Sequence, residues 1–439
     1  MRRIVLVLLL FLGLNIEIRC DASEYPIVTT ALGRIKGSTV KSRLGKTIYS
    51  FRGIRYAKPP VENLRFMPPQ PVDKWEGVYD ATKDGSLCLQ PRMFGNSSED
   101  CLILNIYTTK LPTSENACKR PVIVHIHAGG YFIGGSISTQ MGPNYFLDQD
   151  IVLVTFNYRL ASMGFLSTGD EHAPGNNGLR DQVELLKWVK HNIEPFCGDP
   201  NSVTLLGYSV GGWSALLHMV SSLSQGLFHK AVSMSGSPIG IWPIKTNLLE
   251  AAKKQARLVG CPDDTSEKIV KCLKKVPAEQ LAESLLGFLE FGTNPMMIWG
   301  PVIEGDFGQQ KFLTEHPIRL ITKGNFMKVP YIVGQTKDEV GFKAFGLFHK
   351  AVSMSGSPIG IWPIKTNLLE AAKKQARLVG CPDDTSEKIV KCLKKVPAEQ
   401  LAESLLGFLE RKVVTVNLFI FIQKEMDRLQ SIGVVVSTF

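Results

Sequence analysis

The amino-acid sequence predicts an α/β fold whose core is a mostly parallel, doubly wound sheet with helices on both faces. Hydrophobic residues make up 44% of the 439 residues, which is enough for a sizeable core. Strand and helix patterns alternate along the chain, and such alternation is typical of parallel sheets joined by crossover helices. Buried strands are expected at residues 121–127, 151–158 and 203–206, and helices at residues 179–193 and 211–222.

A serine between the last of these strands and the helix after it organises the rest of the chain. This turn reads Gly207-x-Ser209-x-Gly211. The flanking glycines let strand and helix approach without a clash, so that the serine hydroxyl projects at the carboxyl end of the sheet. The backbone N–H of Val210 then points to where a carbonyl oxygen would gain negative charge. The strand–turn–helix frame favours a nucleophilic Ser209 over a chance glycine-rich loop.

The beginning of the chain has the pattern of a secretory signal peptide. Arg2 and Arg3 precede the apolar run 4–14, and cleavage is expected within residues 20–23, so the signal peptide is assigned to residues 1–22. That run is too short to span a bilayer, and no later stretch is long enough. We therefore expect a secreted, extracellular protein without a membrane span, in a compartment where cysteines can pair.

Charge and two loops add further expectations. The formal net charge of +10 is spread along the chain without a basic cluster, which argues against a nucleic-acid partner.

The pair Gly129 and Gly130 directly follows a strand, and its bare N–H groups suit a second wall of an oxyanion site. An ordinary turn at the end of the strand is the alternative. Asn96 begins the sequence Asn-Ser-Ser, an N-glycosylation sequon.

Six motifs, in this order, resemble the type-B carboxylesterase/cholinesterase family of the α/β-hydrolase fold. They lie at residues 53–60, 99–107, 127–131, 157–160 and 192–200 and at the turn around Ser209. The match covers roughly residues 24–345, and we assign residues 23–345 to one such domain. The resemblance implies an insect-like general carboxylesterase whose C-terminal part is missing from this chain.

The resemblance also implies roles for particular residues. Ser209 would be the nucleophile, and Gly129, Gly130 and Val210 would supply the oxyanion hole. The acid would be Glu339, for which a solvated surface carboxylate is the alternative when it is considered alone. The chain order of serine, acid and then histidine suits hydrolases of this fold. No metal or cofactor is implied.

The cysteines fit the same frame. The resemblance implies two disulfides, Cys88–Cys101 and Cys261–Cys272, each closing a short loop. It offers no partner for Cys118 or Cys197, which could be free thiols. The first loop contains no tryptophan, whereas cholinesterases use a longer loop with a tryptophan that stacks on choline. Tyr208 also replaces the acidic residue that the family often has before the nucleophile. Both departures favour a general carboxylesterase over a cholinesterase.

A long segment of the chain is duplicated. Residues 226–290 recur as residues 346–410, identical at all 65 positions. Structural repeats drift in sequence, so perfect identity indicates a recent duplication or an assembly error. Our hypothesis is a duplicated exon followed by translated non-coding sequence, with residues 411–439 as a tail outside the family. Because one sheet has one place for this segment, apolar residues of the second copy are expected to be half exposed. They are Phe348, Val352, Ile359 and Ile361.

The sequence assigns no histidine to the site. In the family this histidine lies well downstream of the acid, in a His-Gly context. After Glu339 the chain has one histidine, His349, which duplicates His229. His316 resembles a residue at the start of a surface helix. We expect structural or solvent-facing roles for these histidines.

These observations predict a secreted serine hydrolase of small hydrophobic carboxylic esters that acts through an acyl-enzyme. Hydrolysis is expected to be absent or impaired in this chain because the histidine is absent. The alternative is a non-catalytic, cholinesterase-like adhesion or ligand-binding protein, a class that has often lost the serine and usually carries a membrane span. A third possibility is a secreted pseudoenzyme that binds esters without turnover.

Overall fold

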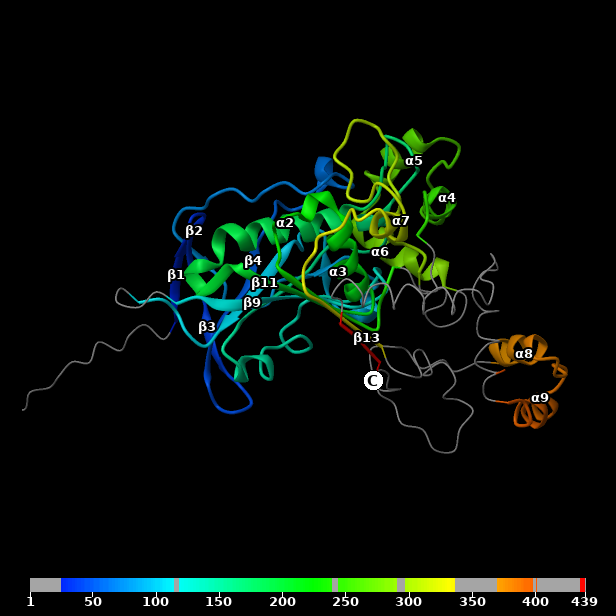
Figure 1. Ribbon diagram of the computed structural model, residues 1–439. Helices are drawn as coiled ribbons and strands as arrows, with labels where there is room; N and C mark the ends of the chain where they lie inside the picture. The colour runs from blue at the N-terminus through cyan, green and yellow to red at the C-terminus, as the bar shows by residue number, and fades with distance from the viewer. Residues whose placement is uncertain are drawn as a thin grey trace, which may run out of the picture.

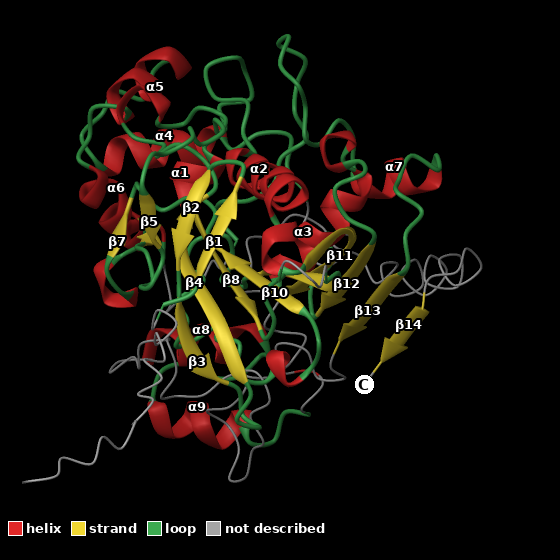
Figure 2. Cartoon of the chain, turned by 90° about the vertical axis from the view of Figure 1, so that its left-hand side faces the viewer, coloured by secondary structure: helices red, strands yellow, loops and turns green. Residues whose placement is uncertain are grey.

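The computed structural model describes residues 25–113, 118–238, 244–289, 297–335, 369–397, 400 and 435–438. Among these residues, nine strands form a central sheet in the order β14-β13-β12-β11-β9-β10-β8-β4-β3 (Figure 2). The strands of this sheet are β3 (Ser38–Lys41), β4 (Thr47–Arg55), β8 (Ile103–Thr108), β9 (Arg120–Ile126), β10 (Val152–Phe156), β11 (Gly198–Tyr208), β12 (Lys230–Met234), β13 (Tyr331–Gln335) and β14 (Val435–Thr438). Smaller sheets are formed by β1 (Ile27–Thr30), β2 (Gly33–Lys36) and β5 (Val78–Asp80), and by β6 (Leu87–Cys88) and β7 (Ser97–Ser98).

The central sheet is mostly parallel, as the sequence predicts. All neighbouring pairs from β10 through β9, β11, β12 and β13 to β14 are parallel. The strands β8, β4 and β3 add an antiparallel edge. Every residue of β10 and β8 is buried, which explains why β10 is a continuous apolar or β-branched run and why β8 is interrupted only by the buried polar residue Asn105 before Tyr107.

Helices connect the strands and pack beside them (Figure 1). The described helices are α1 (Ala161–Phe165), α2 (Asn177–Asn192), α3 (Val210–Val220), α4 (Leu249–Leu258), α5 (Ser266–Leu273), α6 (Ala278–Ser284), α7 (Pro317–Thr322), α8 (Leu369–Leu378) and α9 (Ser386–Leu393). Helix α3 is buried along its whole length and contacts β11, β12 and β9. The expected helices at 179–193 and 211–222 correspond to α2 and α3 with shifts of one or two residues, within the usual uncertainty of helix ends.

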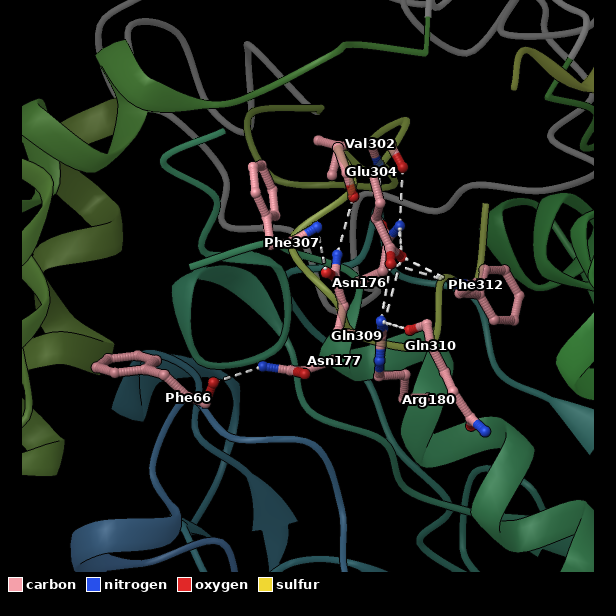
Figure 3. Close-up of polar contacts among 11 residues, drawn as sticks. Phe66, Asn176, Asn177, Arg180, Val302, Glu304, Phe307, Gln309, Gln310 and Phe312 are labelled. Atoms are coloured by element: carbon pink, nitrogen blue, oxygen red, sulfur yellow. Dashed lines mark hydrogen bonds and ion pairs between the residues drawn. The ribbon is translucent and has the colours of Figure 1, made fainter. Parts of the chain in front are cut away.

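Helix α2 is fixed to the loop after residue 301 by a buried polar cluster (Figure 3). The guanidinium of Arg180 donates to Glu304 Oε2 at 2.7 Å, and the side chain of Glu304 is fully buried. Asn176, which has a φ of 62° just before α2, donates to Glu304 Oε1 at 2.6 Å and to the carbonyl of Val302 at 2.8 Å. Burial raises the pKa of Glu304 despite the charge of Arg180. No sequence motif marks this cluster.

The described residues contain four disulfides. Cys88–Cys101 and Cys261–Cys272 are the two pairs that the family resemblance implies. Cys118 and Cys197 are also paired, so the suggestion that they are free thiols is wrong. These cysteines are 79 residues apart in sequence, but they precede the neighbouring parallel strands β9 and β11, which brings their Cα atoms to 5.0 Å. The fourth disulfide, Cys381–Cys392, lies in the second copy and repeats Cys261–Cys272.

Several sequence-based expectations fall outside the described residues. These are the signal peptide at residues 1–22, Glu339, His349 and the four apolar residues of the second copy named above, Phe348, Val352, Ile359 and Ile361. Of the second copy, residues 346–410, the structure describes residues 369–397 and residue 400. Of residues 411–439 it describes β14.

Candidate active site

Ser209 lies at the turn between β11 and α3 in a backbone conformation that serine rarely adopts. Its φ is 55° and its ψ is −124°. The Ser209 N–H donates to the carbonyl of Met234 on β12 at 2.8 Å, and the Ser209 carbonyl accepts the N–H of Trp213 at 3.1 Å. Bonds to both the sheet and the helix therefore hold the strained turn in place. Ser209 itself is neither fully buried nor fully exposed.

Glycines around Ser209 make this turn possible. A Cβ atom at Gly207 would overlap the backbone of Gly211, and one at Gly211 would overlap the carbonyl oxygen of Ile126. A Cβ atom at Gly236 would overlap the carbonyl of Ser209 itself. The sequence motif identified the first two glycines, but it missed Gly236, which comes from the loop after β12 and meets the turn only in the folded chain.

The loop after β9 lies at the same edge of the sheet as Ser209. Strands β9 and β11 are parallel neighbours, with Gly207 paired to Ile126, so their carboxyl ends lie side by side. Gly129 and Gly130 follow β9 with φ values of 121° and 62°, a region that glycine adopts without strain. The structure thus brings the predicted glycine pair next to the serine turn.

Tyr131 joins this loop to the beginning of α3. Its hydroxyl donates to the carbonyl of Val210 at 3.0 Å and lies 3.1 Å from Ser214 Oγ, and burial raises the pKa of the phenol. Because Val210 is the first residue of α3, its own N–H has no carbonyl partner four residues earlier in the helix. Tyr131 therefore fixes the glycine loop relative to the free N–H at the helix start. No sequence pattern marks this role of Tyr131.

A chain of buried hydrogen bonds continues from there into the core. Gln182 on α2 donates to Ser214 Oγ at 3.3 Å, and its carbonyl oxygen lies 2.9 Å from His218 Nε2. His218 Nδ1 lies 2.7 Å from Ser224 Oγ. Burial lowers the pKa of His218 to about 3, so the ring is neutral at physiological pH and its two nitrogens serve as one donor and one acceptor. This network locks α2 and α3 together beneath the site.

His127, the residue before Ala128, is also buried and neutral. Its ring stacks on Tyr158 with the centroids 4.3 Å apart, and Nδ1 lies 2.7 Å from the carbonyl of Ala128. Burial lowers its pKa to about 4. Nε2 of His127 is buried without a partner. His127 therefore shapes the start of the glycine loop.

In the part of the chain that the structure describes, no side chain hydrogen-bonds to the Ser209 hydroxyl. His316 caps α7, since its Nδ1 accepts the N–H of Ile318 at 3.3 Å. His229 Nδ1 accepts the N–H of Val203 at 3.1 Å. Both histidines have the structural roles that the sequence suggests for them. Glu339 lies outside the described residues.

The described residues show neither a cluster of metal ligands nor a membrane-spanning helix. No group of three or more His, Cys, Asp or Glu side chains is placed to hold a metal ion. No helix in that part of the chain has the length and apolarity needed to cross a membrane.

The parallel sheet and the strained serine turn at its carboxyl edge define the class of α/β-hydrolases, and comparisons with known proteins identify the family. The family model described as "Carboxylesterase family" matches residues 24–345 and again residues 342–427. The second match ends inside the segment 411–439, whose sequence carries no recognisable family motif. By this match the chain belongs to the carboxylesterase family.

Individual relatives agree with this assignment. Esterase FE4 of Myzus persicae is 45% identical over 337 residues, which are 75% of this chain and 58% of that protein. Juvenile hormone esterase of Tribolium castaneum is 42% identical over 335 residues, which are 73% of this chain and 56% of that protein. The crystal structure of juvenile hormone esterase from Manduca sexta, with OTFP covalently attached, has a TM-score of 0.72 and 28% identity, and the match covers 94% of this chain and 78% of that one. The chain spans less than two thirds of the length of these two sequence relatives.

Proposed function

We propose that the site hydrolyses small hydrophobic carboxylic esters through an acyl-enzyme formed on Ser209. The observation that carries this proposal is the backbone of Ser209, held at φ 55° and ψ −124° between β11 and α3 beside the glycine loop. Strain of this kind persists where the surrounding structure enforces it, and it exposes the hydroxyl at the edge of the sheet.

The residues around Ser209 suggest how the reaction proceeds. Ser209 Oγ attacks the ester carbonyl carbon, and the N–H groups of Gly129, Gly130 and Val210 stabilise the resulting oxyanion. The alcohol leaves with a proton, and water then attacks the acyl-enzyme to release the acid and regenerate the serine. In the family mechanism a histidine, which is not assigned in this sequence, accepts and returns the proton. Glu339 would orient that histidine.

We further propose that a polypeptide of these 439 residues hydrolyses esters only weakly. Its histidines before Glu339 are described, and none is bonded to Ser209; the remaining one, His349, duplicates His229, whose ring has a structural role. A serine without a general base is a poor nucleophile because its hydroxyl stays protonated. An oxyanion hole and substrate binding alone leave roughly 10³ to 10⁴-fold catalysis over water.

We also propose that the protein is secreted and glycosylated. The four disulfides are typical of an oxidising compartment. Asn96 of the sequon is exposed. The loop closed by Cys88–Cys101 holds no tryptophan, which supports a general carboxylesterase rather than an enzyme for choline esters.

Hydrolysis of p-nitrophenyl butyrate tests the proposed function. We expect slow turnover that is abolished by Ser209→Ala. The control variant Ser222→Ala, at an exposed serine, should have the same turnover as the unmodified chain. Added imidazole should accelerate the reaction if a missing base is the defect, and a fluorophosphonate should label the peptide that contains Ser209.

The outcomes separate the competing functions. Turnover that survives in Ser209→Ala would refute the nucleophile. Absence of turnover, of imidazole rescue and of labelling would favour the non-catalytic binding protein. Rapid turnover that depends on Ser209 without imidazole would refute the impairment, and His349 would be the next residue to mutate.

A further inference from the structure

The two copies of the duplicated segment form the same local structure. Helices α8 and α9 repeat α4 and α5 at the same positions of the repeat. Thr265 and Thr385 cap α5 and α9 by accepting the N–H groups of Lys268 and Lys388, both at 3.3 Å. Each pair of helices is closed by the equivalent disulfide, with 5.8 Å between the Cα atoms. Residues 369–397 therefore form the same helical hairpin as residues 249–277, with the same contacts inside each hairpin.

The surroundings of the two hairpins differ. Val270 on α5 is 9% exposed and belongs to the main core, whereas its duplicate Val390 on α9 is 51% exposed. Ala252 is fully buried, but Ala372 is only half-buried. The buried residues of the second hairpin form a small cluster of their own. Figures 1 and 2 both draw α8 and α9 away from α4 and α5.

The end of α5 in the first hairpin is held by polar contacts with a distant part of the chain. Arg65 donates to the carbonyls of Leu273 and Lys274 at 3.1 and 3.2 Å and also to that of Val276, while Glu99 binds the same guanidinium at 2.6 Å. A cation at the last carbonyls of a helix satisfies acceptors that have no partner within the helix.

Lys274 Nζ reaches the carbonyl of Asn63 at 3.5 Å. Among the described residues, no guanidinium donates to the duplicate carbonyls of Leu393, Lys394 and Val396. We call Asn63, Arg65, Glu99 and the part of the core under Val270 the seat.

We propose that the α8–α9 hairpin is a second ligand for the seat and replaces the α4–α5 hairpin of the same chain when the latter is weakened. The two hairpins have the same sequence, so the seat makes the same contacts with either one. Docking would cover Val390 and satisfy the carbonyls at the end of α9. Because both hairpins belong to one chain, each competes at the high effective concentration of an intramolecular ligand.

Matched substitutions in the two copies test this exchange. Val270→Asp puts a carboxylate against the core, and Val390→Asp makes the same change in the second copy. If the second hairpin replaces the first, each single variant lowers the Tm by less than about 2 °C and the double variant lowers it by about 8 °C. A Val270→Asp variant as unstable as the double variant would overturn the proposal.

A cross-link measures occupancy of the seat directly. Asn63→Cys with Lys394→Cys, treated with a short bis-maleimide, should cross-link within one chain about tenfold more in the Val270→Asp background. The matched control, Asn63→Cys with Lys274→Cys, reports the first hairpin and should cross-link less in that background. A cross-link between two chains, or none at all, would overturn exchange within the chain.

Discussion

The turn around Ser209 depends on three glycines from different parts of the chain. Gly207 and Gly211 flank the serine, and Gly236 approaches from the loop after β12. In each case the space of the missing side chain is taken by backbone atoms, which cannot move aside as a flexible side chain could. The glycines therefore set how close α3 comes to β9 and β11, and with that the place of the Ser209 hydroxyl.

Alanine substitutions at two glycines test this close approach. Gly211→Ala should lower the free energy of unfolding by about 3 kcal/mol, because the new methyl group overlaps the carbonyl oxygen of Ile126 and pushes α3 from β9. Gly300→Ala is the control, since its Cβ would meet its nearest atoms at 3.6 and 3.7 Å. Urea unfolding measures both, and equal effects would show that the close approach carries no cost.

At the scale of elements, α2 connects the core beneath α3 to the loop after residue 301. Its Gln182 belongs to the hydrogen-bonded chain beneath α3, and its Arg180 binds Glu304 in the following loop. Burial lowers the pKa of Arg180 and raises that of Glu304, so both ionised groups are stabilised mainly by each other. The loss of one partner would leave a buried charge without compensation.

A double-mutant cycle tests the pair. Arg180→Met should cost about 3 to 5 kcal/mol of stability, because Glu304 stays buried without its cation. Arg180→Met combined with Glu304→Met should recover most of this loss, since two apolar side chains can fill the same space. Urea unfolding of the wild type, both single variants and the double variant gives the coupling energy, and additive losses would refute a coupled pair.

At the scale of the whole molecule, buried histidines make stability depend on pH. Burial lowers the pKa of His125 and His127 to about 4 and that of His218 to about 3. Between pH 6.5 and about 4 the unfolded chain binds protons that the folded chain excludes, so stability falls as the pH falls through this window. Each histidine contributes up to about 1.4 kcal/mol per pH unit.

Replacing one of these histidines should weaken that dependence. His218→Gln keeps a polar side chain at this position and removes one titrating group, so the slope of unfolding free energy against pH should decrease by up to about 1.4 kcal/mol per pH unit. The matched control is His191→Gln, on the exposed side of α2. Urea unfolding between pH 4.5 and 7 measures the slopes, and an unchanged slope in His218→Gln would contradict the buried neutral ring.

Local pattern predicted much of the core of this fold. Strands β9 and β10 and helices α2 and α3 lie close to where the apolar periodicity places them, whereas the short helix α1 was not predicted. Buried runs and a Gly-x-Ser-x-Gly turn are properties of neighbouring residues. Strand β11 is longer than expected and begins at Gly198, where its pairing with β9 is irregular before Val203. The catalytic roles of Ser209, the glycine pair and Glu339 remain predictions.

Contacts between distant residues could not be predicted in the same way. Cys118–Cys197, Tyr131 with Val210 and Arg180 with Glu304 each join residues that approach only when the strands and helices pack together. No spacing in the sequence marks such pairs, and with one sequence a cysteine, a tyrosine or an arginine has many possible partners.

The duplicated segment separates the two levels of information directly. Sequence alone determined the helices, the caps and the disulfide, because these form in both copies from contacts within the hairpin. Only the tertiary structure decided that Val270 is buried and Val390 is exposed. The physical reason is that burial needs a partner surface, and in this structure the seat is occupied by the α4–α5 hairpin.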